Sequence, residues 1–286
     1  MTPYLEGESK ARFDRWHEGL VARFTRELSY QEIRKGVQSL SASYVARRGR
    51  LGEGSAFDGE GKRAAFALFF APLHFLAAYH AVREIDFHRI PAARIWDLGC
   101  GTGAAGAAWA VAMQEARGAC GASESAAGPA EAAGAATPDG EAPQRGAKIL
   151  GVDRSGFALG EARETYRALG VAGETRRMDL TREIPRGKGA ALLAYTLNEL
   201  PDRAREQMLS HLRSAAFRPL LVLEPVARRV APWWTRWERA LGQEALAVHA
   251  FEWRRRLELP DWIAGMDRAA GLDHAEMTAR VLGFVG

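Results

Sequence analysis

The segment WDLGCGTGAAG, from Trp96 to Gly106, has glycine at positions 99, 101 and 103 and then continues with the small residues Ala104, Ala105 and Gly106. It fits two motifs. Counted from Gly101, the residues GTGAAG match the G-x-G-x-x-G turn of dinucleotide-binding folds. Counted from Asp97, the residues DLGCGTG form an acidic glycine loop, D-x-G-x-G-x-G. The two registers imply different cofactors.

The position of Asp97 favours the acidic register. In the dinucleotide register Asp97 would lie inside a strand buried on both faces, where an unpaired carboxylate is strongly destabilising. In the acidic register the strand covers residues 94–97 and ends on the carboxylate. An acid there suits the cationic sulfonium of S-adenosylmethionine (SAM), and helix N-terminal amides suit its carboxylate. We therefore expect SAM to contact Asp97, Gly99, Cys100, Gly101 and Gly103.

The chain after the loop alternates short apolar runs with helical segments, which is typical of βαβ units. We expect strands at 94–97, 148–152, near 176–178, 191–197 and 220–223, and a final strand at 279–284. Helices are expected at 104–113, 156–169 and 201–215, and two more after residue 232. This order predicts an α/β fold, a Rossmann-like, doubly wound and mostly parallel sheet, for residues 91–286.

Residues 1–90 are predicted to form a helical N-terminal region. Apolar residues recur at helical spacing within 11–28, and Ser29 to Glu32 has the form of a capping box. The stretch 64–82 carries no formal charge and approaches transmembrane length. Because it contains Pro72 and two histidines, we interpret it as a kinked helix buried in the protein, with no membrane span.

The segment 114–146 interrupts this scheme, because it contains no Val, Ile, Leu, Met, Phe, Tyr or Trp. Such a composition cannot bury enough apolar surface to fold, so we expect a disordered insertion. Without the insertion, the separation between Asp97 and Asp153 is close to the roughly 20 residues typical of a dinucleotide-binding unit.

Further acids and polar residues follow the later strands. Asp153 ends its strand and can accept hydrogen bonds from two ribose hydroxyls, while Asp179 is placed to meet the adenine amino group. Their neighbours Arg154 and Leu180, together with Tyr195, complete the expected cofactor contacts. Asn198 and Glu199 are catalytic candidates, since a carboxylate there can take a proton from the acceptor. Alternatively, both residues only stabilise the turn before the helix that begins at Pro201.

The run ALLAYTLNELPDRAREQML (191–209), with Glu224 and Pro225 after LLVL, carries a more specific resemblance. From about Tyr44 to Pro225 the chain resembles class I SAM-dependent methyltransferases, in particular bacterial relatives of the methyltransferase-like protein of the mitochondrial small ribosomal subunit. The resemblance implies a SAM-binding protein that acts on ribosomal RNA or on small-subunit assembly. The matching ligand residues are Asp97, Gly99, Gly101, Gly103, Asp153 and Asp179.

The amino-acid composition bears on metal binding, cellular location and the type of partner. The two cysteines, Cys100 and Cys120, are too few for a disulfide framework or for the four-cysteine iron–sulfur cluster found in some relatives, so no metal is expected. The N-terminus lacks a secretory pattern, which predicts a cytoplasmic protein. The net charge of +4 permits an RNA partner.

The segment 228–239 mixes cations with aromatic residues: Arg228, Arg229, Trp233, Trp234, Arg236, Trp237 and Arg239. This mixture is typical of an RNA-stacking surface, but the tryptophans also have the helical spacing of a buried stripe. The leading functional hypothesis is a SAM-dependent methyltransferase. The alternatives are a non-catalytic SAM-binding ribosome-assembly factor and a nucleotide-dependent oxidoreductase.

Overall fold

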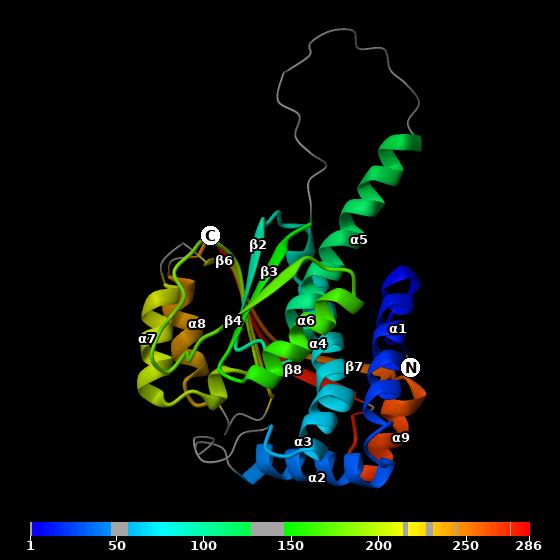
Figure 1. The fold of residues 1–286 in the computed structure, drawn as a ribbon. Helices are drawn as coiled ribbons and strands as arrows, with labels where there is room; N and C mark the ends of the chain where they lie inside the picture. The colour runs from blue at the N-terminus through cyan, green and yellow to red at the C-terminus, as the bar shows by residue number, and fades with distance from the viewer. Residues whose placement is uncertain are drawn as a thin grey trace.

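The protein is organised around one eight-stranded sheet, shown in Figure 1. The computed structural model describes residues 2–46, 57–126, 146–213, 217–226, 231–243, 245–274 and 276–286. Its strands are β1 (Thr2–Pro3), β2 (Arg94–Leu98), β3 (Lys148–Asp153), β4 (Gly173–Arg177), β5 (Gly189–Ala194), β6 (Phe217–Glu224), β7 (Ala247–Glu258) and β8 (Glu276–Val285). The α-helices are α1 (Gly7–Phe24), α2 (Tyr30–Ala46), α3 (Glu60–Ala65), α4 (Ala71–Glu84), α5 (Ala104–Ala126), α6 (Gly156–Ala168), α7 (Asp202–Leu212), α8 (Trp234–Gly242) and α9 (Asp261–Ala270). A π-helical turn, η1 (Phe66–Phe70), and two 3-10 turns, η2 (Phe87–Arg89) and η3 (Leu197–Glu199), complete the elements.

The strand order is β1-β7-β8-β6-β5-β2-β3-β4. The five strands from β4 to β6 are mutually parallel, whereas β8 is antiparallel to both β6 and β7. Counted from β2, the parallel strands have the order 3-2-1-4-5 of a doubly wound fold. The predicted fold class is therefore confirmed. The order reverses between β2 and β5, and ligands of such sheets bind at the carboxyl ends of the strands beside that point.

Both faces of the central strands are buried, because successive side chains point to opposite sides of the sheet. On β2, Ile95 packs into the apolar cluster shared with α1, α4, α5 and α6, and Trp96 into the cluster shared with α7 and α8. Figure 1 shows these two helical layers on either side of the sheet. The predicted runs at 94–97, 148–152 and 220–223 form strands for this reason, each extending one or more residues further.

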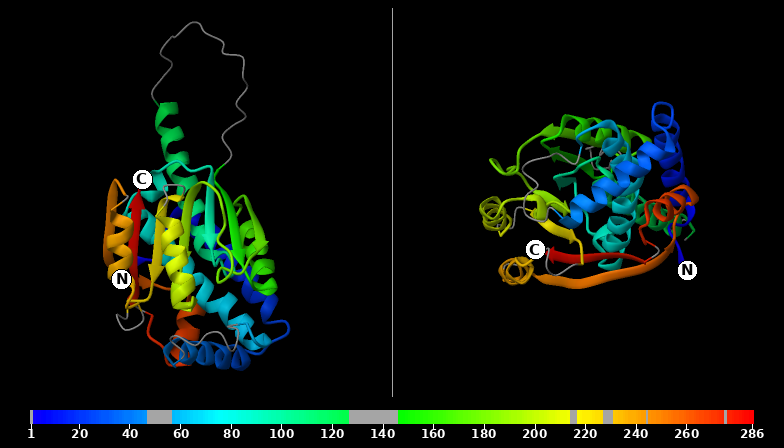
Figure 2. Two further views of the ribbon diagram at one scale, coloured as in Figure 1. Left: turned by 90° about the vertical axis from the view of Figure 1, so that its left-hand side faces the viewer. Right: turned by 90° about the horizontal axis from the view of Figure 1, so that it is seen from below.

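The antiparallel pair of β7 and β8, which α9 connects, lies toward the edge of the sheet that ends with the short β1 (Figure 2). The final predicted strand is confirmed as β8, and the two helices expected after residue 232 are α8 and α9. The 12-residue β7 was not predicted. Most of its side chains are exposed, so it lacks the apolar run by which the central strands were recognised.

The apolar stretch near Pro72 belongs to one continuous helical run, Glu60–Glu84, formed by α3, η1 and α4. It is long and apolar enough to span a membrane, but 89% of its most apolar window is buried inside the fold. Since Pro72 has no N–H to donate, the helix changes to a π turn ahead of it. The Leu68 carbonyl lies 3.1 Å from Nε2 of buried His17, which donates to it.

The N-terminal region contains the predicted capping box. The Ser29 hydroxyl accepts from the Glu32 N–H at 3.3 Å, and the Glu32 carboxylate accepts from the Ser29 N–H at 2.8 Å. The helix α2 lies across the end of the sheet at which the parallel strands finish (Figures 1 and 2). One apolar cluster contains residues from this region and from the sheet, and the boundary at residue 90 stays a prediction.

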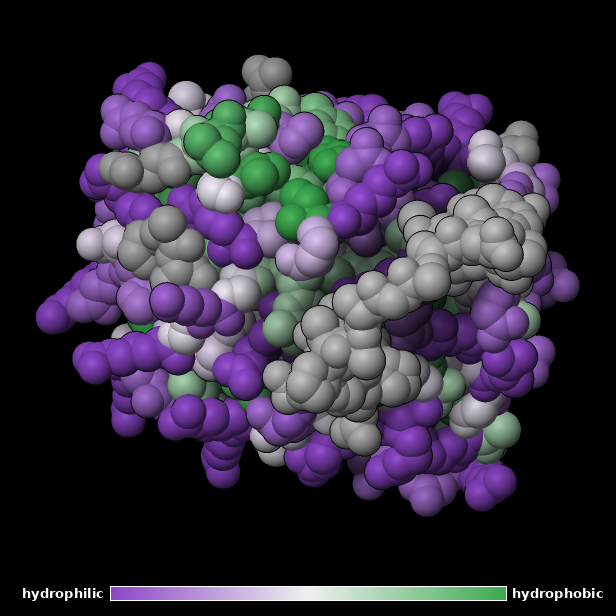
Figure 3. All heavy atoms as spheres, turned by 90° about the horizontal axis from the view of Figure 1, so that it is seen from above, coloured by the Kyte–Doolittle hydropathy of each residue, from purple (hydrophilic) through white to green (hydrophobic). Residues whose placement is uncertain are grey.

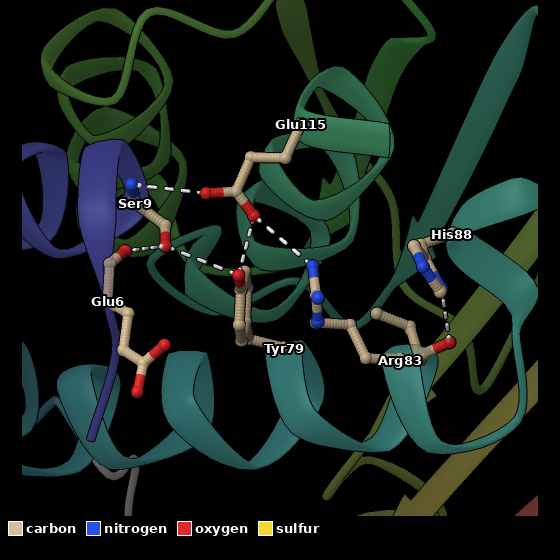
Figure 4. A network of polar contacts seen from close by, with 7 residues as sticks. Glu6, Ser9, Tyr79, Arg83, His88 and Glu115 are labelled. Atoms are coloured by element: carbon tan, nitrogen blue, oxygen red, sulfur yellow. Dashed lines mark hydrogen bonds and ion pairs between the residues drawn. The ribbon is translucent and has the colours of Figure 1, made fainter. Parts of the chain in front are cut away.

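The predicted insertion at 114–146 was placed too early. Helix α5 continues to Ala126, and residues 127–145 lie outside the described part of the chain. Figure 4 shows why the helix is anchored here: the Glu115 carboxylate accepts from the Ser9 N–H (3.1 Å) and the Tyr79 hydroxyl (2.5 Å) and lies 3.4 Å from Arg83. Glu115 thus caps the start of α1, which has no side-chain cap of its own. The predicted insertion was based on composition, which does not reveal this polar contact.

The opposite end of the sheet, where the parallel strands begin, presents a mostly hydrophilic surface with one apolar area (Figure 3). Leu246, which is 85% exposed, and the half-exposed Val248 lie at the start of β7 beside the end of β8. The site described next is at the other end of the sheet.

Candidate active site

A cavity of about 80 Å³ lies at the carboxyl ends of β2, β3 and β5. Its wall comes from the glycine loop after β2, the turn after β5 and the N-terminal helical region. The lining residues are Phe57, Phe66, His74, Asp97, Gly99, Cys100, Gly101, Thr102, Ala104, Ala105, Asp153, Ala194, Tyr195, Thr196 and Glu199. The cavity therefore lies beside the reversal of strand order, where a doubly wound fold binds its ligand.

The glycine loop has a backbone path that only glycine adopts easily. Gly99, Gly101 and Gly103 all have positive φ angles, of 77°, 51° and 77°. A Cβ atom on Gly99 would lie 2.4 Å from the Thr196 side chain, and one on Gly103 would lie 2.7 Å from the Tyr166 ring. The loop is consequently packed between α6 and the turn after β5, which fixes its shape beside the cavity.

Two carboxylates flank the loop. The strand β2 continues to Leu98, so Asp97 lies one residue before the strand end at which the sequence analysis placed it. Its side chain is 1% exposed, and its Oδ2 accepts from the Gly106 N–H at 3.1 Å, near the start of α5. Burial raises the pKa of Asp97 to about 7. Asp153 ends β3 as predicted, and it accepts from the N–H groups of Gly101 (3.0 Å) and Ser155 (2.8 Å). Burial also raises the pKa of Asp153, against the effect of these hydrogen bonds.

Thr102 gives the loop an additional polar group that the sequence analysis did not single out. Its hydroxyl is buried, lines the cavity and has no hydrogen-bond partner among the described residues. Cys100 is also buried in the cavity wall, and burial raises the pKa of its thiol well above the usual value. The thiol is therefore neutral at pH 7.

The turn after β5 brings Tyr195 and Glu199 to the cavity. Tyr195 has a φ of 58°, so β5 ends before it, whereas the sequence predicted a strand to residue 197. Its ring stacks on that of His74, with centroids 4.2 Å apart. Burial lowers the pKa of His74 to about 3, which keeps the imidazole neutral. Glu199 lines the cavity, where desolvation and, after it, the nearby Asp153 raise its pKa to about 7.

The other predicted residues lie outside the cavity lining. The Asp179 carboxylate accepts from the N–H and hydroxyl of Thr181, and Leu180 is buried in the apolar cluster below α7. Arg154 is exposed, and its carbonyl accepts from the Arg177 side chain. Asn198 donates to Glu224, so its side chain supports the turn. Gly103 also lies outside the lining, and the cofactor roles of Gly103, Arg154, Asp179 and Leu180 stay predictions.

The tryptophans of the segment 228–239 belong to the core. Trp233, Trp234 and Trp237 are buried against α7 and the sheet, as the helical spacing allowed. Arg236 forms an ion pair with Glu206, while Arg228 and Arg229 lie outside the described residues. The interpretation of these three rings as an RNA-stacking surface is therefore wrong, because the faces of the rings are buried in the core.

Several residues of the site were not predicted. Thr196, whose hydroxyl donates to the Leu98 carbonyl (3.0 Å), holds the turn after β5 against the glycine loop. Glu224 is a fully buried acid at the end of β6. Glu224 could have been found from the sequence, because it ends an apolar strand as Asp153 does. His74 and Phe66 reach the site from the N-terminal region, and no local pattern places them there.

The strand order, the acidic glycine loop after β2 and the acid ending β3 define a Rossmann-like α/β domain with the architecture of class I methyltransferases. No protein-family model and no curated protein matches the chain.

Solved structures similar to the chain include methyltransferases of several kinds. One is the 16S rRNA methylase RmtB (14% identity, 90% of this chain and 76% of that chain, TM-score 0.42). Another is the magnesium protoporphyrin IX methyltransferase ChlM from Synechocystis PCC 6803 with bound SAM (17% identity, 90% and 97%, TM-score 0.42). A third is the methyltransferase domain of bacterial CtHen1-C (13% identity, 75% and 97%, TM-score 0.42). At such low identity the likeness concerns the fold, which the strand order establishes independently.

Proposed function

We propose that this protein is a SAM-dependent methyltransferase that modifies small-subunit ribosomal RNA or its assembly intermediates. The observation that carries the proposal is the loop of Gly99 to Gly103, which lies between the carboxylates of Asp97 and Asp153 at the carboxyl end of the sheet. The Thr102 hydroxyl in the same wall has no partner among the described residues, so it is available to form a hydrogen bond with a polar cofactor.

The charge of the cavity favours SAM over a dinucleotide. The Asp97 carboxylate already accepts an N–H of the first turn of α5, where a pyrophosphate would otherwise bind. With Asp153 and Glu199 also lining the cavity, a pyrophosphate would meet three acidic side chains. The sulfonium and amino groups of SAM are positive and are attracted by the same residues. This argument disfavours the nucleotide-dependent oxidoreductase.

The residues present fit the roles that SAM requires. Asp153 has lone pairs left to accept from ribose hydroxyls, and the Thr102 hydroxyl can donate to the cofactor carboxylate. When bound, SAM supplies an already activated methyl group, so the protein contributes mainly positioning. Glu199 can take a proton from the acceptor, because its pKa of about 7 matches neutral pH.

The site has to open for the cofactor to enter. Pockets for drug-sized ligands have volumes of about 300–1,000 Å³, against about 80 Å³ here. Phe57 and Phe66, whose ring centroids are 5.0 Å apart, lie on the cavity wall, and Phe66 approaches the loop at Gly101. We expect these rings to move outward when SAM binds.

The acceptor is inferred from the resemblance of the run 191–209 to methyltransferases of the small ribosomal subunit, and the net charge of +4 is compatible with RNA. A direct test incubates the protein with methyl-labelled SAM and small-subunit particles or their RNA. We expect label in the RNA with wild type and with the exposed control Glu27→Gln, and none with Asp153→Ala. Label in protein alone would refute the RNA acceptor, and salt-dependent RNA binding without transfer would favour the assembly factor.

A further inference from the structure

The carboxylate of Glu224 joins the end of β6 to the turn that follows β5. It is 0% exposed, and its two oxygens each accept one hydrogen bond. One comes from the Leu197 N–H at 2.8 Å, and the other comes from the side-chain amide of Asn198. A single buried side chain thus holds two consecutive residues of the turn from the neighbouring strand.

The turn needs such support because its backbone is strained. Tyr195 has a φ of 58°, a left-handed conformation that is unfavourable for a non-glycine residue. Three contacts fix other parts of the turn: the Tyr195 N–H donates to the Leu223 carbonyl (2.8 Å), Thr196 donates to Leu98, and the Arg205 guanidinium donates to the Leu197 carbonyl (2.8 Å). The Glu199 N–H donates to the Thr196 carbonyl within the turn (3.0 Å), and the Glu224 carboxylate holds the two residues that directly precede Glu199.

We propose that Glu224 is a positioning residue, which holds the Leu197–Asn198 peptide so that the Glu199 carboxylate faces the reacting groups. The proposal rests on the proposed methyltransferase function. It assigns Asn198 to the support of the turn, where it acts through Glu224, and leaves Glu199 as the group that contacts the acceptor.

The role of Glu224 depends on hydrogen bonds and requires no charge. Burial raises its pKa to about 8, so the carboxyl is largely neutral at pH 7. A glutamine in its place can accept from the Leu197 N–H and donate to the oxygen of a rotated Asn198 amide. A leucine of similar size can do neither. The two substitutions therefore separate positioning from acid–base chemistry.

The test compares Glu224→Gln, Glu224→Leu and Asn198→Ala with wild type and the control Glu27→Gln. SAM affinity is measured by calorimetry and methyl transfer by steady-state kinetics. We expect Glu224→Gln to keep kcat within about threefold, and Glu224→Leu and Asn198→Ala to lose up to about 100-fold, the effect of a reacting group misplaced by about 1 Å. SAM affinity and acceptor KM should change little. If Glu224→Leu does not fold, Asn198→Ala provides the test, because it removes one of the two hydrogen bonds to Glu224.

Two results would overturn the proposal. If Glu224→Gln loses as much kcat as Glu224→Leu, the reaction requires the ionisable group itself, and the proposed positioning role of Glu224 is wrong. If Glu224→Leu weakens SAM binding with kcat unchanged, Glu224 serves the cofactor instead. Amide hydrogen exchange at Leu197 gives a readout without any acceptor: protection should persist in Glu224→Gln and fall in Glu224→Leu, and unchanged protection in Glu224→Leu would overturn the proposal. Methyl transfer absent from wild type, with this exchange pattern intact, would refute the proposed function alone.

Discussion

Replacing Asp97 by asparagine should stabilise the protein at alkaline pH while it weakens the cofactor site. The buried Asp97 carboxyl has a pKa of about 7, against 3.8 when it is exposed. The folded protein therefore binds this proton more tightly than the unfolded chain, and ionisation destabilises the fold as pH rises from about 4 to about 7. A difference of about three pKa units corresponds to about 4 kcal/mol. Asparagine keeps an oxygen for the Gly106 N–H and carries no charge.

The expected gain for Asp97→Asn is close to zero at pH 4 and rises to at most about 4 kcal/mol at pH 8. Urea unfolding of both proteins at several pH values measures it, with Glu27→Gln as the exposed control. Glu224 is present in both proteins and its contribution cancels, whereas the repulsion between Asp97 and Asp153 is part of the measured difference. A difference in unfolding free energy that does not change with pH, or a loss of stability at pH 8, would refute the reasoning.

Three further predictions concern the anchor of α1, the proton acceptor and the glycine loop. Glu115→Ala should lower the free energy of unfolding by about 1–3 kcal/mol, because the buried Ser9 N–H loses its partner; an unchanged urea midpoint would contradict this. At saturating SAM, the methyl-transfer rate should rise between pH 6 and 8 as Glu199, with a pKa of about 7, loses its proton, and Glu199→Gln should be slower with this rise removed; a Glu199→Gln profile like that of wild type would exclude Glu199 as the base. Gly103→Ala should abolish SAM binding or folding, since its Cβ would lie 2.7 Å from the Tyr166 ring; normal SAM affinity in this variant would show that the loop can relax.

The parallel sheet and the glycine loop were predictable because both are local patterns. A strand buried on two faces reads as an apolar run, and a loop with positive φ angles requires glycine. The strand β7 escaped prediction because its exposed, charged residues resemble a solvated segment. Residues 114–126 were misassigned because an alanine-rich helix held by one polar anchor, Glu115, has no apolar signal.

The candidate site was predictable only in part. Asp97 and Asp153 follow from their places at or near the ends of apolar strands and Glu199 from its place after one, and the structure brings all three to one cavity. His74 and Phe66 come from a helix whose docking on the sheet depends on tertiary packing, so spacing in the sequence could not locate them. The tryptophan stripe at 233–237 shows the opposite case, in which spacing allowed two interpretations and burial decided between them.

The central claim is that the acidic glycine loop binds SAM. Calorimetric titration of the wild-type protein with SAM and, separately, with NAD tests it most directly. We expect a saturable SAM signal that is lost in Asp153→Ala and kept in the control Glu27→Gln, and no signal with NAD. Saturable NAD binding, or SAM affinity unaffected by Asp153→Ala, would contradict the account.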